Sequence, residues 1–291
     1  MDLSLTIDVI SNPDPNFFYS NYIKKNKPAL IKGLTVNAPA MTKWNFGYFQ
    51  ETMGHFRVPV FDTRKTTSIS AYTKPDLYMR FGDFLDCLQN QESCPYRIFL
   101  FDVFRANPEL RKDFPCPELA KGILGKLGFI FFASKNTSVR MHYDIDMSHV
   151  FHTQFSGKKR AILFAPEFSS LLYRLPLNTF SLVDLFRNNR TIYPGLQYVK
   201  GYDVVLEHGD TLFIPSGYWH EMNYLENGFS VSYRKLSSRI SQPINGFLNL
   251  SIFMWMDKAG NFISKEKWLK AKQNIAERRA NSAIKKLSSL K

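Results

Sequence analysis

The chain has 291 residues, of which 44% are apolar and 15% aromatic, so it can bury one substantial core and is not a disordered protein. Its longest apolar stretch is too short to cross a bilayer, and we expect no membrane association. Three cysteines, Cys87, Cys94 and Cys116, have the spacing of neither a disulfide framework nor a zinc site, and Met1–Ser11 lacks a secretory signal, so we expect a cytoplasmic protein.

The net charge of +13 is concentrated at the C-terminal end. The segment Ser264–Lys291 carries nine Lys or Arg residues against two Glu. A basic tail of this kind can contact RNA, an acidic partner or a membrane surface, but it is more often a solvated helix face. RNA is therefore a candidate partner, and the solvated face is the simpler interpretation.

Residues 1–95 are predicted to form an N-terminal segment of mixed helix and strand that packs on the core. Asn16–Lys24 has a helix-like pattern, and a short strand follows and ends at Gly33. Two further helices are predicted over Asn45–Gly54, with Asn45 as the cap, and over Arg80–Asn90, where large apolar residues recur at helical spacing.

Residues 96–242 are predicted to form a mainly β domain built from short strands separated by turns. The predicted strands are Tyr96–Asp102, Gly128–Ala133, His142–Ile145, Val150–Phe155, Lys159–Phe164, Val204–Glu207, Thr211–Pro215, Trp219–Asn223 and Phe229–Arg234. Many short strands without long helices between them are typical of a barrel or jelly roll. Pro166–Leu196 interrupts the series as a loop-and-helix insert, which we expect to cover the mouth of that barrel.

Residues 243–291 are predicted to be a helical, basic tail, with the strongest helical pattern over Lys265–Leu287. A partial apolar stripe runs along this helix through Trp268, Ile275, Ala280, Ile284 and Leu287. Such a stripe packs either on its own domain or on a second copy of the chain, so a homodimer through these helices is possible.

The chemistry is indicated by two histidines and one carboxylate. His142 and Asp144 are two residues apart in a predicted strand, so both side chains should project from the same face. His220 opens the strand that returns after the turn at Ser216–Tyr218. Two imidazoles and a carboxylate are the ligands of open Fe(II) sites, whereas structural zinc sites are closed. The alternative is that these histidines are ordinary buried side chains with hydrogen-bond partners.

The segments Met141–Asp144, Phe155–Pro166 and Gly209–His220 carry a resemblance to a known family. They resemble the JmjC/cupin-like Fe(II)- and 2-oxoglutarate-dependent oxygenases, including the factor-inhibiting asparaginyl hydroxylase and the tRNA wybutosine hydroxylase. The resemblance extends from about Pro28 to Arg234. It implies a double-stranded β-helix, a jelly-roll core of the cupin/JmjC type.

The resemblance also implies residue roles. Iron would be held by His142, Asp144 and His220, and the distal carboxylate of 2-oxoglutarate would pair with Lys159. The interval between His142 and Lys159 is two residues longer than in the relatives and contains two additional histidines. Counting back from Lys159 places His152 on the inward face, where it either binds the co-substrate or simply packs, whereas His149 is expected to be an exposed turn residue.

The function implied is hydroxylation of a side chain in a protein or peptide by a 2-oxoglutarate-dependent dioxygenase. Two alternatives stay open. The first is a hydroxylase that modifies RNA, such as a tRNA base, and the second is a non-catalytic cupin-like binding protein. The sequence does not distinguish hydroxylation from demethylation, because a fold does not determine the substrate.

Overall fold

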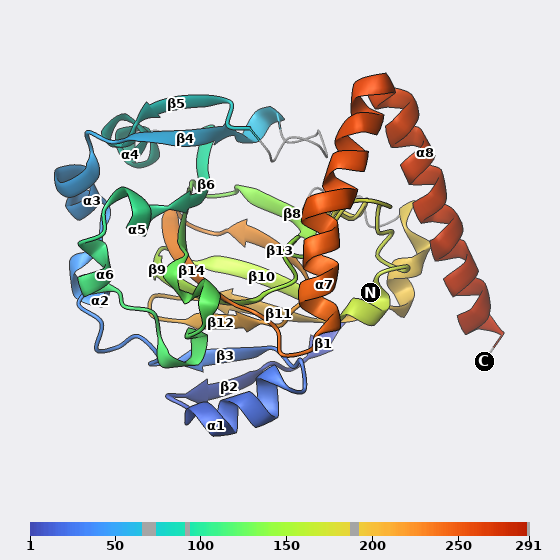
Figure 1. Ribbon diagram of the computed structural model, residues 1–291, viewed down its shortest axis with the longest axis horizontal. Coiled ribbons are helices and arrows are strands. Elements are labelled where there is room, and N and C mark those ends of the chain that lie inside the picture. The colour runs from blue at the N-terminus through green and yellow to red at the C-terminus, as the bar shows by residue number, and fades with distance from the viewer. Residues whose placement is uncertain (66–73, 91–93, 187–191, 290–291) are drawn as a thin grey trace.

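The computed structural model describes residues 1–65, 74–90, 94–186 and 192–289. Two β-sheets form the centre, helices of the first hundred residues cover one side, and a long C-terminal helix α8 stands at the other end (Figure 1). These are the double-stranded β-helix sheets expected from the sequence. Over the described ranges, no helix is both long and apolar enough to span a membrane.

The larger sheet has the strand order β2-β3-β12-β9-β14-β7-β6-β4-β5. The strands are β2 Asp8–Ser11, β3 Ala29–Lys32, β4 Arg57–Asp62, β5 Leu77–Arg80, β6 Tyr96–Asp102, β7 Gly128–Ala133, β9 His149–Ser156, β12 Thr211–Ile214 and β14 Gly228–Lys235. The smaller sheet has the order β1-β11-β10-β13-β8, formed by β1 Asp2–Leu5, β8 Ser138–His142, β10 Lys159–Phe164, β11 Lys200–Leu206 and β13 Trp219–Tyr224. Nearly all pairs are antiparallel, as a jelly roll requires; β1 with β11 and β2 with β3 are parallel.

Helices occupy the two ends of the chain. The α-helices are α1 Pro15–Phe18, α2 Ala40–Lys43, α3 Phe46–Met53, α4 Phe81–Asn90, α5 Val103–Ala106, α6 Leu110–Asp113, α7 Ser241–Leu248 and α8 Met254–Ser288. Two π-helical turns, η1 Tyr19–Ile23 and η9 Asn249–Phe253, extend α1 and join α7 to α8. The Asn45 side chain accepts a hydrogen bond from the Tyr48 N–H, so the predicted cap of α3 is confirmed.

Side chains alternate between two environments along the central strands. In β14, Phe229, Val231 and Tyr233 enter an aromatic core beneath the N-terminal helices, while the intervening residues point between the sheets. A second apolar core lies between the sheets and includes Leu163 of β10 and Leu212 of β12. The site therefore lies in the barrel interior, where the inward residues of both sheets converge.

The C-terminal helix α8 is broken at Ser264, whose φ of −161° and ψ of 99° are not helical, and it doubles back as a hairpin (Figure 1). In the second arm, Ala276 and Ala280 are fully buried against the insert and the smaller sheet, and Ile284 and Leu287 pack beside them. The apolar stripe of the tail therefore packs mainly within its own chain. This packing removes the observation that suggested a homodimer.

Four sequence expectations need correction here. The strand expected over His142–Ile145 ends at His142, because the chain turns there into a loop. The strands β1, β2, β4 and β5 were not predicted: β1, β2 and β5 have only four residues each, and β4 contains Pro59. In the insert, the residues described between Pro166 and Leu196 form turns and 3₁₀ segments but no α-helix; residues 187–191 lie outside the described ranges.

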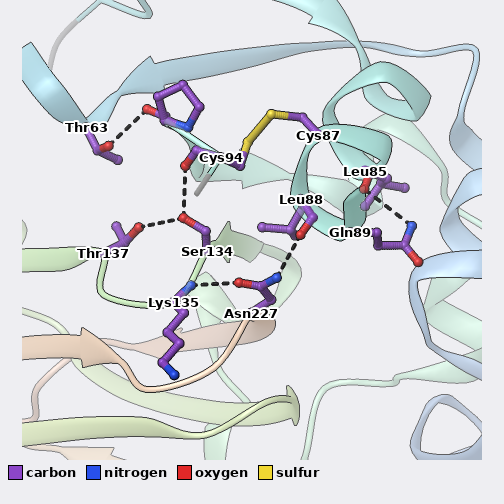
Figure 2. The surroundings of a disulfide bond; sticks show 11 residues. Thr63, Leu85, Cys87, Leu88, Gln89, Cys94, Ser134, Lys135, Thr137 and Asn227 are labelled. Carbon is purple, nitrogen blue, oxygen red and sulfur yellow. Dashed lines mark hydrogen bonds between the residues drawn. A yellow bond between two sulfur atoms is a disulfide. The ribbon is translucent and has the colours of Figure 1, made fainter. Parts of the chain in front are cut away.

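The fourth correction concerns the cysteines. Cys87 at the end of α4 and Cys94 before β6 form a disulfide, with Cα atoms 5.5 Å apart (Figure 2). Around it, the Cys94 carbonyl accepts a hydrogen bond from Ser134 Oγ at 2.9 Å, and the Leu88 carbonyl accepts one from Asn227 Nδ2 at 2.8 Å. The cysteine argument for a cytoplasmic protein is therefore lost. Cys116 is free.

Candidate metal centre

Three predicted ligands meet at one end of the barrel. His142 is the last residue of β8 and lies directly opposite His220 of β13 in antiparallel register, with ring centroids 4.2 Å apart. Asp144 follows two residues later, in the loop after β8. One ligand atom from each of the three residues lies within 4.8 Å of the others, which is close enough for a single ion to bridge them. The loop, rather than a shared strand face, brings the carboxylate to the histidines.

Both imidazoles are oriented as metal ligands. Nδ1 of His142 is 2.8 Å from the Arg140 carbonyl, and Nδ1 of His220 is 3.1 Å from the Tyr218 carbonyl. Because a carbonyl oxygen only accepts, each Nδ1 carries the proton, and each Nε2 keeps its lone pair. Two aligned Nε2 atoms and a carboxylate fit a divalent iron, with coordination positions left open toward the cavity.

The electrostatics of the three groups also suit a metal. Burial lowers the pKa of His142 to about 3, and the neighbouring His220 adds to the effect; burial likewise lowers the pKa of His220. Both rings are therefore neutral near pH 7, the form that ligates. Burial alone would raise the pKa of Asp144, but the Arg234 guanidinium and the two imidazoles together hold it below its usual range.

Arg234 is a site residue that the sequence reasoning missed. Its Nη2 lies 2.8 Å from Asp144 Oδ1, and its Nη1 lies 2.9 Å from Asp146 Oδ1 and 3.0 Å from Ser148 Oγ. These contacts hold the whole acidic loop in place. The period-two alternation of β14 could have identified Arg234, since Ser230 and Ser232 precede it on the same inward face.

The triad opens into a cavity of about 430 Å³. Its walls come from both sheets, from the insert and from the C-terminal helices, and they are mostly apolar. The aromatic lining residues are Phe99, Phe129, Phe131, Tyr143, Phe180, Tyr224 and Phe253. Leu250, Met254, Lys258 and Asn261 of η9 and α8 add one wall. The C-terminal segment is thus part of the pocket as well as a basic tail.

Lys159 and His152 both line this cavity, as the inward register from Lys159 predicts. Lys159 is 1% exposed, and its Nζ lies 3.0 Å from His152 Nε2 and 2.5 Å from Ser230 Oγ. Burial lowers the pKa of Lys159 well below its usual value. Lys158 and Arg160, on the other face of β10, pair with surface carboxylates.

His149 does not have the environment expected for it. It is fully buried, not an exposed turn residue, because β9 begins at His149 and its side chain packs against Phe213. Its Nδ1 accepts a hydrogen bond from the Ser216 N–H at 3.0 Å, and burial lowers its pKa to about 4. His149 is therefore a structural residue that ties β9 to the turn before His220. His208 is exposed, as expected.

The fold agrees with the comparisons to known proteins. The family model of the cupin-like domain matches residues 15–240, most of the chain. The chain belongs to this family, in the group whose members include JmjC proteins. The family match therefore supports the fold that the sequence motifs indicated.

Several curated relatives are similar at low identity. Lysine-specific demethylase JMJ30 of Arabidopsis thaliana is 28% identical over 74% of this chain and 51% of its own length. Lysine-specific demethylase 8 of Danio rerio is 28% identical over 76% of the chain and 56% of its length. tRNA wybutosine-synthesizing protein 5 of Danio rerio is 25% identical over 78% of this chain and 74% of its own length. The chain spans about half the length of the two demethylases.

Proposed function

We propose that this protein is an Fe(II)- and 2-oxoglutarate-dependent dioxygenase that hydroxylates a side chain of a protein or peptide. One observation carries the proposal: the triad His142, Asp144 and His220 opens into the same cavity as the buried cation of Lys159. The structure records no carboxylate within ion-pair distance of Lys159 in the parts of the chain that it describes. A ligand that chelates the metal at one end and carries an anion at the other would satisfy both.

Each part of the site has a defined task in this reaction. Bound iron and 2-oxoglutarate would supply the oxidising chemistry. His142, Asp144 and His220 would hold the metal on one side, Arg234 keeps the Asp144 carboxylate ionised and oriented, and Lys159 would receive the distal carboxylate. The aromatic residues that line the cavity would limit the access of water to the reacting centre.

The charges of the cavity favour an uncharged target over a methylated cation. Asp144 and Asp146 are paired with Arg234, and Asp257 is paired with Lys272 at 2.5 Å and accepts a hydrogen bond from Trp268 Nε1 at 2.8 Å. These are the acidic residues that line the described cavity. Because each already has a cationic partner, the pocket offers no uncommitted carboxylate to a methyl-lysine or an arginine. We therefore place hydroxylation ahead of demethylation.

Succinate release tests the proposal. The purified chain, supplied with Fe(II), ascorbate and 2-oxoglutarate under oxygen, should release succinate slowly even without its target, and His142→Ala should abolish the release. A chain that binds metal and 2-oxoglutarate but releases no succinate would instead be a non-catalytic cupin-like binding protein. Mass spectrometry of peptides from the host proteome, with and without the enzyme, would then look for a gain of one oxygen.

RNA modification is the second candidate, supported by one specific observation. The second arm of α8 exposes Lys265, Lys267, Lys270, Arg278, Arg279, Lys285 and Lys286, and one of the relatives is a tRNA wybutosine-synthesizing protein. Reversing Lys285 and Lys286 to Glu should weaken tRNA binding and reduce its salt dependence, whereas the metal site should be unaffected. Binding that does not change with salt or with these substitutions would remove RNA as a target.

Self-association stays a separate proposal. Around α7 and the first arm of α8, Ile244, Phe247, Trp255, Phe262 and Ile263 are more than half exposed, and contiguous exposed apolar residues are typical of an interface. We propose a homodimer through this face. A monomeric mass by light scattering at micromolar concentration, unchanged by Phe247→Glu, would contradict it.

A further inference from the structure

Lys159 occupies an unusual environment for a buried cation. Its ammonium group contacts two neutral acceptors, His152 Nε2 at 3.0 Å and Ser230 Oγ at 2.5 Å, and lies 4.1 Å from the centroid of the Tyr224 ring. All of these groups are on inward positions of β9, β10, β13 and β14. The fold therefore holds the cation with dipoles and an aromatic face.

The direction of each hydrogen bond follows from the chemistry of the groups. Burial lowers the pKa of Lys159, and a bound carboxylate would favour its charged form. That ammonium only donates, so His152 Nε2 accepts from Lys159, and the ring proton lies on Nδ1. Nδ1 is 2.7 Å from Ser232 Oγ, to which it therefore donates. The order of donation is Lys159 to His152 to Ser232. Burial and the charge of Lys159 both lower the pKa of His152, which keeps the ring in the neutral form that this order requires.

A count of donors shows what is left for a ligand. The ammonium has three N–H groups, and His152 and Ser230 accept two of them. For the third, the recorded neighbour of the ammonium is the Tyr224 ring, which lines the same cavity. An aromatic face attracts a cation more weakly than a carboxylate does, so an anion entering the cavity would take this third N–H.

We propose that His152 is a positioning residue for anion recognition: it fixes the Lys159 ammonium by accepting one N–H, so that another is presented to the distal carboxylate of a dicarboxylate. This inference rests on the proposed 2-oxoglutarate site and specifies how that site is built. This role differs from both expectations for His152, since the residue would act on the co-substrate through Lys159 and would neither bind it directly nor simply pack. Ser232 in turn fixes the His152 tautomer.

The test compares two ligands that differ only at the far end. 2-Oxoglutarate and 2-oxopentanoate share the metal-chelating keto acid and the five-carbon chain, but the second lacks the distal carboxylate. Their Kd values on the Mn(II)-loaded full chain, measured by titration calorimetry, give a ratio that reports only on recognition of that carboxylate. Mn(II) affinity, measured first, reports on the triad.

The variants separate orientation from packing. His152→Leu keeps the volume but removes the acceptor, and it should reduce the ratio at least about tenfold with Mn(II) affinity unchanged. His152→Gln restores an acceptor near the Nε2 position and should keep the ratio within about threefold of wild type. Ser232→Ala should reduce the ratio by less than His152→Leu does, and it provides a second reading if the leucine variant fails to fold.

Two results would overturn this inference, and they distinguish a wrong role for His152 from a wrong co-substrate site. If the wild-type chain discriminates between the two acids and His152→Leu discriminates equally well, the positioning role is wrong while the 2-oxoglutarate site stands. If the wild-type chain binds Mn(II) but does not distinguish the two acids, the co-substrate site itself is wrong, and this inference fails with it.

Discussion

The guanidinium of Arg234 and the carboxylate of Asp144 form a buried ion pair, with Nη2 2.8 Å from Oδ1. Arg234 belongs to the larger sheet, whereas His142 and His220 belong to the smaller one. The ion pair therefore fixes the third ligand relative to the other two across the mouth of the barrel. A ligand on a loop needs such a partner, because the strand that carries His142 has already ended.

Replacing Arg234 by Gln should weaken metal binding by about 10- to 100-fold. The carboxylate would lose its fixed orientation, and its pKa would rise, so that protons compete with the metal. Mn(II) affinity by titration calorimetry measures the effect. The matched control is Arg160→Gln, which removes a guanidinium that pairs with Asp203 on the outer face. Equal Mn(II) affinity in Arg234→Gln and wild type would show that Arg234 does not support the ligand.

The buried His149 should make stability depend on pH. Its pKa is about 4 in the folded chain and about 6.5 when unfolded, so between these values only the unfolded state binds the proton. The free energy of unfolding should therefore fall as pH falls from 6.5 to 4, by up to about 3 kcal/mol from this residue.

Urea unfolding of the metal-free chain across this pH range measures the slope. His149→Asn keeps an acceptor for the Ser216 N–H but cannot take up the proton, so its slope should be smaller than that of wild type. Burial also lowers the pKa values of His142, His152 and His220, so part of the dependence of stability on pH should remain in His149→Asn. His55→Asn, on the exposed surface, is the matched control. An identical slope in His149→Asn and wild type would contradict this account.

Much of the barrel could be predicted from sequence, because alternating strands leave a period-two pattern that local residues alone reveal. The bounds of β6, β7 and β10 match those expected, those of β12 and β13 differ by one residue at one end, and those of β9 and β14 differ by one residue at each end. Of the four missed strands, β1, β2 and β5 lie at sheet edges and are partly exposed, so their apolar signal is weak. The fourth, β4, has buried side chains but contains Pro59, which argues against a strand.

The sequence predicted the candidate metal ligands but not the residues that hold these ligands in place. Motif spacing nominated His142, Asp144 and His220, and the family resemblance added Lys159; the fold brings the first three together. Period-two alternation in β14 places Arg234 and Ser230 on the inward face, but the residues that they contact depend on which strand pairs with which, and no local pattern contains that information. His149 was misplaced because burial depends on the turn at Ser216, 67 residues away.

The disulfide should stabilise the fold modestly. Cys87 and Cys94 are seven residues apart, and the chain-entropy relation gives about 2.5 kcal/mol for a loop of this size. Cys94→Ser should lower the free energy of unfolding by this amount under non-reducing conditions. Reductant should lower the free energy of unfolding of the wild type to the value measured for Cys94→Ser. Cys116→Ser serves as the control, because Cys116 is free. Insensitivity of the wild type to reductant would show that the bond does not contribute.

The second arm of α8 should be an integral part of the fold. Ala280 is fully buried against the insert and the smaller sheet, whereas its neighbour Asn281 is exposed. Ala280→Asp should therefore cost about 3 kcal/mol or more, because it places an unpaired charge in an apolar contact. Asn281→Asp should change the free energy of unfolding by less than about 0.5 kcal/mol. Equal stability of the two variants, measured by urea unfolding, would mean that this arm does not pack on the core.

The most direct test of the metal centre is the stoichiometry of metal binding in the purified chain. Wild type, loaded with Fe(II) without oxygen and freed of excess metal, should retain one ion per chain by elemental analysis. His142→Ala and His220→Ala should each retain essentially none, while His208→Ala, which alters an exposed histidine, should retain one. A stoichiometric ion in folded His142→Ala would contradict the assignment of this site.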